Sequence, residues 1–250
     1  MAKISALIIC LNEAEKIADC IQSLQAVADE ILVLDSFSSD QTPQTCQNLP
    51  KVHFVQHQWL GYGKMKNHGH ELAKHDFILS LDADERLDKE LQAAILKVKP
   101  HLIAEQAFSF NRLTQYCGQW IYHSGWYPEW KIRLFHRKNA FWEGDIHERL
   151  KFKSPHTKVQ KLSGHCLHFT IESLSGHLMQ VDKYSSIWAE TAYQNHRKLP
   201  FFLAFLKAIV KFWKIYLFKK GFLDGKRGLM IATVSAFAVL LRSFKLALKQ

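Results

Sequence analysis

The chain has 250 residues, of which 48% are hydrophobic, 12% aromatic and 22% charged, and this is the composition of a folded globular protein. It excludes a disordered chain, a collagen-like fibre and a small disulfide-stapled scaffold. Residues 197–250 contain 12 Lys and Arg against one acid, Asp224, whereas the first 196 residues contain 21 Lys and Arg against 22 acids. The basic C-terminal segment suits an anionic partner, either phospholipid head groups or nucleic acid.

Cysteine usage and the N-terminus both favour a cytoplasmic location. The five cysteines are widely separated and form no Cys-x-x-Cys pair, which is typical of a reducing compartment. Residues 4–9 enter a strand-like apolar run at once, without the cleavage-site pattern of a secretory signal peptide. We therefore expect a cytoplasmic protein.

Short apolar runs alternate with helical patterns over the first 100 residues. The sequence predicts strands at residues 4–11, 30–34, 52–55 and 77–81. Helices are expected between them, with Asn12 and Asp40 as caps of the first two and a third over residues 64–73. This alternation predicts an α/β fold with a mostly parallel central sheet flanked by helices.

The pattern changes after residue 100. A strand is expected at residues 107–112, and helical periodicity returns over residues 172–197 and 201–218. Lys207, Lys211 and Lys214 recur at helical spacing among large apolar residues, so this segment predicts a cationic amphipathic helix. A spanning helix needs ~20 predominantly apolar residues, and the apolar run 229–241 is shorter. We expect peripheral attachment to an anionic membrane surface, although a helix packed on the rest of the protein with its lysines in water has the same periodicity.

Polar side chains follow three of the predicted strands. They are Asn12 with Glu13, residues 35–40, and Asp82 with Asp84. Since the carboxyl ends of parallel strands meet at one edge of a sheet, where α/β proteins bind ligands, these side chains are expected to lie together. Two Asp residues one position apart can hold a hard divalent cation such as Mg²⁺ or Mn²⁺, and a turn with a helix cap is the structural alternative.

Several ordered motifs resemble those of inverting, nucleotide-sugar-dependent glycosyltransferases of family 2, which have the GT-A fold. The matching stretches are residues 8–13, 33–42, 61–67 and 79–85. Together with residues 142–148, Trp-Glu-Gly-Asp-Ile-His-Glu, they look like the glucosyltransferases that extend the heptose region of the lipopolysaccharide inner core. The Gln-x-x-Arg-Trp element of processive polysaccharide synthases is missing, which favours transfer of a single sugar.

The resemblance implies a GT-A nucleotide-sugar-binding domain over residues 1–171, with a nucleotide-sugar half at about 1–100 and an acceptor half at about 101–171. Residues 172–250 would be a helical C-terminal extension. The implied activity is inverting transfer of one sugar, with glucose expected, from a UDP-sugar to a heptose of the lipid A-core oligosaccharide. The implied location is the inner face of the bacterial inner membrane.

The resemblance also implies donor-binding and metal-binding residues. Donor contacts are expected from Asn12, Glu13, Asp35, Lys64, Lys66 and Asp82. Lys66 stands where the family often has Arg and offers a point charge instead of a bidentate fork. Asp82 and Asp84 would form the metal motif, with Asp84 the expected direct ligand of Mg²⁺ or Mn²⁺. His168 is a third candidate metal ligand, with a hydrogen-bonded core histidine as the alternative.

The transfer needs a carboxylate that takes the proton of the acceptor hydroxyl. Glu148 is the expected base and Asp145 the reserve. The sequence departs here from the broader family, whose usual Glu-Asp pair is replaced by Gly-Asp-Ile-His-Glu. A surface or cap role for Glu148 is the structural alternative. His147 is expected to orient the base or the acceptor. Arg133 is expected to contact the diphosphate or an anionic acceptor, or else to be a snorkelling strand residue.

Two other functions are compatible with parts of the sequence. Phosphohydrolases of the haloacid dehalogenase type also carry Asp-x-Asp after an apolar strand, but there the motif usually follows the first strand, and Arg86 stands where those enzymes have Thr. A nucleic-acid-binding protein would account for the basic tail. Its bases, however, interleave with large apolar residues and no nucleic-acid module is recognisable, so we expect no nucleic-acid partner.

Overall fold

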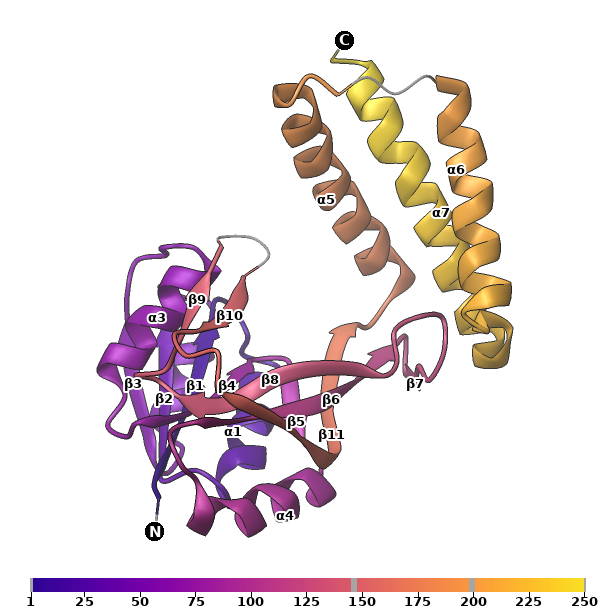
Figure 1. Ribbon diagram of the computed structural model, residues 1–250. Helices are drawn as coiled ribbons and strands as arrows, with labels where there is room; N and C mark the ends of the chain where they lie inside the picture. Colours follow the sequence, from indigo (N-terminus) through magenta and orange to yellow (C-terminus); the bar gives the residue numbers. More distant parts are fainter. Residues whose placement is uncertain (1, 145–147, 198–200, 250) are drawn as a thin grey trace. The chain divides into compact units, whose positions relative to one another are not determined.

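The computed structural model describes residues 2–144, 148–197 and 201–249. The chain folds into two compact units (Figure 1). The first comprises Met1–Arg112 and Glu129–His168, and the second comprises Leu113–Pro128 and Phe169–Gln250. The predicted functional division at residue 171 stays a prediction, since these units are defined by packing alone.

A mixed sheet forms the centre of the first unit, with strand order β3-β2-β1-β4-β8-β6-β11-β5. The pairs β1–β2, β1–β4 and β2–β3 are parallel, as predicted, and β4 pairs with β8 in the antiparallel sense. A separate antiparallel hairpin joins β9 and β10. The strands are β1 (Ile4–Cys10), β2 (Glu30–Asp35), β3 (Val52–Gln56), β4 (Phe77–Asp82), β5 (Glu85–Leu87), β6 (Gln106–Tyr116), β8 (Glu129–His136), β9 (Ala140–Glu143), β10 (Arg149–Phe152) and β11 (Lys158–Ile171).

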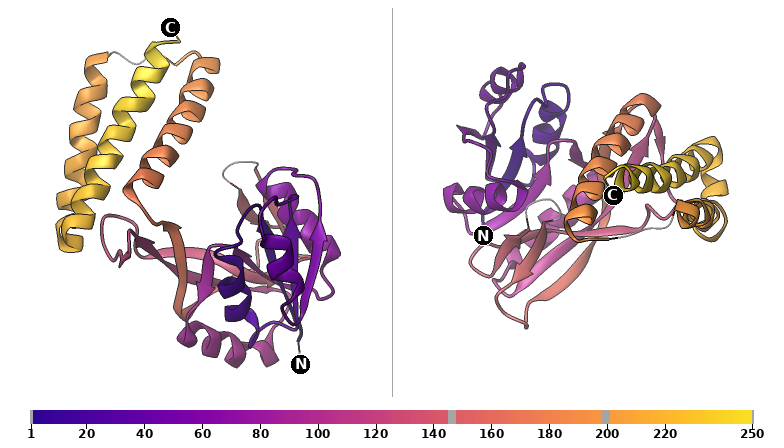
Figure 2. Two further views of the ribbon diagram at one scale, coloured as in Figure 1. Left: turned by 180° about the vertical axis from the view of Figure 1, so that it is seen from behind. Right: turned by 90° about the horizontal axis from the view of Figure 1, so that it is seen from above.

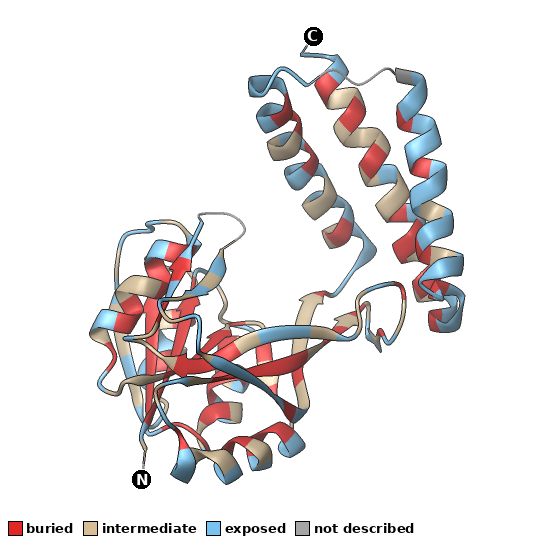
Figure 3. Cartoon of the chain, in the orientation of Figure 1, coloured by how far each residue is buried: buried red, intermediate tan, exposed pale blue. Residues whose placement is uncertain are grey.

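Both faces of the sheet are buried, which explains the continuous apolar runs in the sequence (Figure 3). On one face, Ile4, Ala6 and Ile8 of β1 pack in one core with the buried residues of α1 and α4. On the other face, Leu7 packs in a core with Trp142 of β9. The helices are α1 (Ile17–Leu24), α2 (Thr42–Gln47), α3 (Tyr62–Leu72) and α4 (Lys89–Val98), followed by a 3-10 turn (Lys99–His101). The α/β fold is thus confirmed.

The two predicted helix caps turn out differently. Asn12 is not a cap, because α1 begins at Ile17, and Asn12 has a φ of 56° and accepts a hydrogen bond from the Ser39 backbone N–H at 2.8 Å. Asp40 lies one residue before Gln41, the N-cap of α2, and accepts a hydrogen bond from the backbone N–H of Thr42 at 2.9 Å. Asp40 therefore supports the start of its helix, whereas Asn12 ties two loops together.

The second unit contains three long helices, with α7 between α5 and α6 (Figure 2). Its elements are β7 (Gln119–Trp120), α5 (Leu174–Gln194), α6 (Phe201–Trp213), a π-helical turn (Lys214–Phe218), a 3-10 turn (Gly221–Asp224) and α7 (Gly225–Ala247). The segment Gly221–Ala247 has a mean hydropathy of 1.7 in its most apolar window, so by length and composition it could cross a membrane. The sequence argument, which considered only residues 229–241, underestimated this helix. A core helix of a soluble protein passes the same test.

Helix α6 packs on α7 through small residues. Ala204 and Ala208 are buried, whereas most of the large apolar side chains of α6 are exposed. Phe212 is half-buried, and the ring of Phe205 contacts that of Phe244 on α7. At 100° per residue these exposed side chains centre on the side of the helix opposite the two alanines. We call this surface the α6 outer face, formed by Phe202, Leu206, Ile209, Val210 and Trp213 of α6 and Leu217 of the following π-helical turn, which are 47–74% exposed.

Candidate active site

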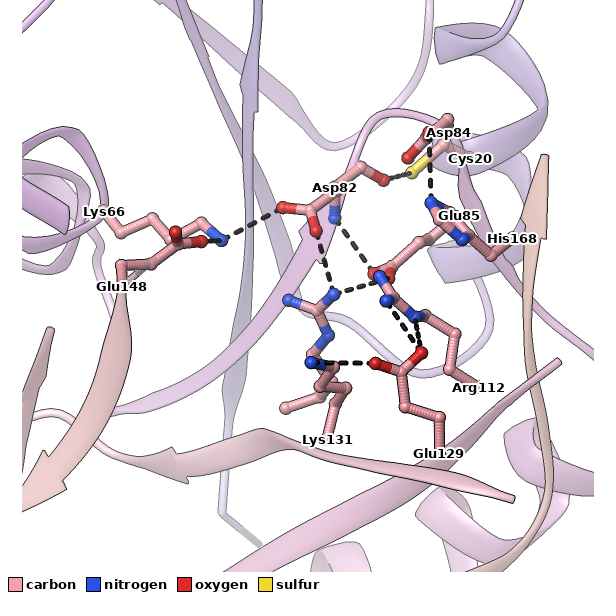
Figure 4. A network of polar contacts seen from close by, with 11 residues as sticks. Cys20, Lys66, Asp82, Asp84, Glu85, Arg112, Glu129, Lys131, Glu148 and His168 are labelled. Atoms are coloured by element: carbon pink, nitrogen blue, oxygen red, sulfur yellow. Dashed lines mark hydrogen bonds and ion pairs between the residues drawn. The ribbon is translucent and has the colours of Figure 1, made fainter. Parts of the chain in front are cut away.

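Three residues far apart in the sequence meet beside the carboxyl end of β4 (Figure 4). The Lys66 Nζ on α3 lies 3.0 Å from Asp82 Oδ1 and 2.9 Å from Glu148 Oε1. The Lys66 side chain is only 2% exposed, while those of Asp82 and Glu148 are 35% and 18% exposed. One buried cation therefore joins the first carboxylate of the Asp-x-Asp motif to the expected base, and both carboxylates keep access to solvent.

Arg133 of β8 forms a second ion pair with Asp82. Its Nη2 lies 2.9 Å from Asp82 Oδ2 and also pairs with the fully buried Glu85. Burial by itself would raise the pKa of Asp82, but the charges of Lys66 and Arg133 hold it well below its usual range. Asp82 is therefore a carboxylate at neutral pH. Arg133 is 4% exposed and so does not snorkel to solvent, and its contact with a diphosphate stays a prediction.

The ion pairs continue as a chain of alternating sign. Beyond Arg133, Glu85 pairs with Arg112 at 3.4 Å, and Arg112 pairs with Glu129 at 2.7 Å. The last ion pair of this series joins Glu129 to Lys131 at 3.0 Å. The third acid of the motif, Glu85, thus has guanidinium counterions, a role that local sequence could not reveal because Arg112 and Arg133 lie far along the chain.

Asp84 and His168 form a separate pair. His168 Nε2 on β11 lies 3.3 Å from Asp84 Oδ2, and the two side chains are 13% and 22% exposed (Figure 4). Adjacent ligands of an octahedral cation with bonds of about 2.1 Å lie about 3.0 Å apart, so this pair fits two positions of a Mg²⁺ or Mn²⁺ shell. Among the described residues no group of three His, Cys, Asp or Glu side chains could hold a metal. Asp82 instead faces Lys66 and Arg133.

Hydrogen bonds connect the loop that follows β1 to the loop that follows β2. The backbone N–H of Asn12 donates to Ser38 Oγ at 2.8 Å, and the backbone N–H of Glu13 donates to Thr42 Oγ1 at 2.9 Å. Asp35 is fully buried at the end of β2 and accepts from the Ser38 backbone and from Gln56 Nε2 at 3.0 Å. The predicted residues Asn12, Glu13 and Asp35 therefore share one edge of the sheet, as expected.

The remaining predicted residues are less constrained. Lys64 is exposed in the first turn of α3. Asp145 and His147 lie outside the described residues, so their predicted roles stay predictions.

Helix α3 holds the segment that precedes Glu148. Asn67 makes two reciprocal 2.8 Å hydrogen bonds with the backbone of Trp142 on β9. A Cβ added to Gly63 would lie 2.4 Å from the Gly144 carbonyl oxygen, so only glycine permits this approach. Sequence reasoning included Gly63 and Asn67 in a motif but missed this role, because their partners lie in a distant hairpin.

Trp142 connects α3 to the site in two further ways. Its ring lies 4.6 Å below the Lys66 ammonium, and its Nε1 donates to His70 Nε2 at 3.2 Å. Burial, followed by the charges of Arg137 and Lys66, lowers the pKa of His70 to about 4. His70 is thus neutral at pH 7 and accepts the indole hydrogen bond.

Comparisons with known proteins show the family of the chain. A model of glycosyl transferase family 2 matches residues 5–173. An uncharacterized glycosyltransferase of Rickettsia felis is 30% identical over 264 residues, covering 98% of this chain and 90% of that protein. The lipopolysaccharide core biosynthesis glycosyltransferase LpsC of Rhizobium meliloti is 26% identical over 255 residues, covering 93% and 90%.

Among solved structures, the mannosyltransferase PcManGT of Pyrobaculum calidifontis, in complex with GDP-Man and Mn²⁺, is 12% identical with a TM-score of 0.51. The superposition covers 98% of this chain and 74% of that one, and it supports the fold. The match to the family model excludes the haloacid dehalogenase alternative. The chain has the GT-A fold, belongs to glycosyltransferase family 2 and is a glycosyltransferase.

Proposed function

We propose that the protein transfers one sugar, glucose, from a UDP-sugar to a heptose of the lipopolysaccharide inner core with inversion of the anomeric centre. The observation that carries this proposal is the meeting of Asp82, Lys66 and Glu148 at one partly exposed site. The motif resemblance supports the UDP-sugar, and the relation to a lipopolysaccharide core enzyme supports the acceptor class.

Glu148 is the base in this proposal. Its carboxylate takes the proton from the acceptor hydroxyl as the new glycosidic bond forms and the bond to the diphosphate breaks. Asp145 is the alternative base, and full turnover of Glu148→Gln would favour it. Lys66 holds the Glu148 carboxylate in place and keeps a positive charge beside it. A single displacement inverts the anomeric carbon, so no covalent sugar–enzyme species is needed.

Asp84 and His168 are the residues proposed to hold Mg²⁺ or Mn²⁺. When bound, the cation supplies Lewis-acid stabilisation of the charge that develops on the leaving diphosphate. Asp82 is already balanced by Lys66 and Arg133, so we assign it to donor contact and to positioning Lys66. The proposal therefore gives different tasks to the two Asp residues of the motif.

A donor screen tests this proposal, with UDP release measured in the presence of purified core oligosaccharide. We expect activity with UDP-glucose that EDTA abolishes and Mg²⁺ or Mn²⁺ restores. Glu148→Gln should lose about 100- to 10,000-fold in kcat, as removal of a general base does. The matched control is Glu143→Gln, since Glu143 is 63% exposed in the same hairpin and, among the described residues, its ion pair is with Lys151. Full turnover of Glu148→Gln, or of Asp84→Ala, would refute the assigned roles.

The second unit supports the proposed membrane partner. The α6 outer face is apolar and solvent-exposed, five lysines lie between residues 207 and 220, and Asp224, the one acid of residues 197–250, is 3% exposed. Such a surface suits the headgroup region of an anionic bilayer. We expect flotation with vesicles that contain phosphatidylglycerol. Trp213→Glu should weaken it, whereas Leu96→Glu, at a 44% exposed position of α4, should not.

A further inference from the structure

The segment that joins α6 to α7 exposes large apolar side chains to solvent. It comprises residues 214–227, which form the π-helical turn, the 3-10 turn and the start of α7, and we call it the α6–α7 turn. Phe218 is 81% exposed, and Phe222 and Leu223 are 47% and 55% exposed. The turn lies at one end of the second unit, with the C-terminal end of α7 at the other (Figure 1). Removing apolar area from water is favourable, so neighbouring exposed apolar side chains indicate a contact surface.

Hydrogen bonds hold the α6–α7 turn in this form from its inner side. The Asp224 carboxylate, which is 3% exposed, accepts hydrogen bonds from Ser124 Oγ at 2.7 Å and from the Tyr122 backbone N–H at 3.2 Å. The Lys219 carbonyl accepts one from the Ser124 backbone N–H at 2.9 Å. The turn therefore buries its carboxylate and exposes its phenylalanines, which is the reverse of what a surface in contact with water alone requires.

The exposed charges of the α6–α7 turn are all positive. They belong to Lys214, Lys219, Lys220 and Lys226, and Asp224 is the one acid of the turn. Positive charge around an apolar patch complements a bilayer that contains anionic lipids, because such a bilayer has a negative surface and an apolar interior. A second copy of the chain is a poorer partner, since a symmetric contact would bring the lysines of one turn against those of the other.

Two aromatic side chains with a polar group adjoin the turn. Tyr122, whose backbone N–H bonds Asp224, is 49% exposed, and Trp213, the last residue of α6, is 47% exposed. Tyr and Trp concentrate at the level of the lipid headgroups, where the ring contacts apolar chains and the O–H or N–H contacts water. The apolar, amphipathic aromatic and basic side chains at this end of the unit are thus those of a membrane-contacting segment.

We propose that the α6–α7 turn penetrates an anionic bilayer, with Phe218, Phe222 and Leu223 below the headgroups and the four exposed lysines on the lipid phosphates. The inference rests on the membrane partner of the proposed function and names the segment that enters the membrane. It also limits the depth of entry, since interfacial segments enter by about 5–10 Å. Phe237 is 45% exposed but lies about 18 Å along α7 from Gly225, its first residue, so Phe237 stays in water.

Flotation of the full chain with vesicles tests the contact. The vesicles contain phosphatidylcholine with phosphatidylglycerol, or phosphatidylcholine alone. Phe218→Ser should bind the anionic vesicles about tenfold more weakly, because it withdraws one phenylalanine side chain from the bilayer. The matched control, Phe237→Ser, should bind as wild type does. Circular dichroism checks that each variant folds.

Removal of one charge from the turn tests the role of the lysines. Lys220→Asn should weaken binding to the anionic vesicles about fivefold and leave the residual binding to phosphatidylcholine unchanged. Asn is the replacement because Lys220 has a φ of 53°, a left-handed conformation that Asn tolerates. Equal binding of Lys220→Asn and wild type to anionic vesicles would contradict the contact between lysines and phosphates.

A fluorophore reports how deeply the turn enters. Phe218→Cys and Phe237→Cys are each labelled with the environment-sensitive fluorophore NBD, and labelled wild type gives the background from the native cysteines, of which Cys117 is partly exposed. With anionic vesicles we expect the emission to shift to the blue at position 218 and to stay unchanged at position 237. A shift at both positions would mean that the length of α7 enters the bilayer, and a shift at neither that the turn stays outside. Either result overturns the inference.

The outcomes separate this inference from the proposed function. UDP release with water-soluble core oligosaccharide needs no membrane, so it should be the same in wild type, Phe218→Ser and Lys220→Asn. If wild type does not float, the membrane partner fails together with this inference, and UDP release still tests the transfer reaction. If Trp213→Glu detaches the protein from vesicles but Phe218→Ser does not, only this inference is wrong. A dimer in analytical ultracentrifugation that Phe218→Ser dissociates would assign the turn to a second copy and overturn the inference.

Discussion

Replacing Lys66 by Met should expose how tightly the site depends on one ammonium group. The Lys66 side chain is 2% exposed and pairs with two carboxylates at 2.9 and 3.0 Å. Removing one partner of a buried ion pair costs about 3–5 kcal/mol. Because the side chains of Asp82 and Glu148 are 35% and 18% exposed, water compensates part of this loss. We expect Lys66→Met to lower the free energy of unfolding by about 2–3 kcal/mol.

A double-mutant cycle separates the ion pair from other effects of the substitution. In the Lys66→Met background Glu148 is left without its cation, so adding Glu148→Gln should restore about 1 kcal/mol of stability, and the coupling energy should reach about 1–2 kcal/mol. Urea unfolding of the four proteins, followed by far-ultraviolet circular dichroism, measures it. The control cycle uses Lys151 and Glu143, whose 3.7 Å pair is at least half exposed and should couple by less than about 0.5 kcal/mol. Additive effects at Lys66 and Glu148 would refute the reasoning.

Three further outcomes can be checked. Because His70 has a pKa of about 4 in the fold and about 6.5 in the unfolded chain, stability should fall by up to about 3 kcal/mol as pH drops from 6.5 to 4, and unfolding of His70→Gln should depend less on pH. Gly63→Ala should displace the Gly144 carbonyl and lower kcat by roughly 100-fold while calorimetry shows unchanged UDP binding. Asn67→Ala should also lower kcat, whereas Asn139→Ala, which loses one hydrogen bond to Ala104 elsewhere in the first unit, should change stability alone.

The sequence predicted the fold of the first 100 residues well because its signals are local. Apolar runs mark β1, β2 and β4, and the loops after them carry the polar side chains of the ligand edge. The prediction that Asn12 caps the first helix was wrong. Asn12 has a left-handed backbone and is followed by four non-helical residues, and no sequence pattern distinguishes this arrangement from a helix cap. Local propensity could not compete with the contacts that Asn12 makes to the next loop.

The residues of the candidate site were expected from the sequence, whereas the contacts between them were not. Glu148, Asp82 and Lys66 were all expected to act, yet no pattern showed that one lysine joins the two acids. The sequence also did not reveal which face of α6 packs on α7. Periodicity reveals that a helix has two faces, but Ala204 and Ala208, the residues that actually pack, are too small to mark the packing face.

Helix α3 has a consequence for how such enzymes diversify. One side of it rests on β1, where Gly69 lets Leu7 approach closely, and another side carries Lys66 and the hydrogen bonds to the β9–β10 hairpin. The distance between Asp82 and Glu148, which Lys66 bridges, therefore depends on the position of a single helix. Substitutions in β9 and β10 that leave the hydrogen bonds between Asn67 and Trp142 intact can accumulate without altering that distance.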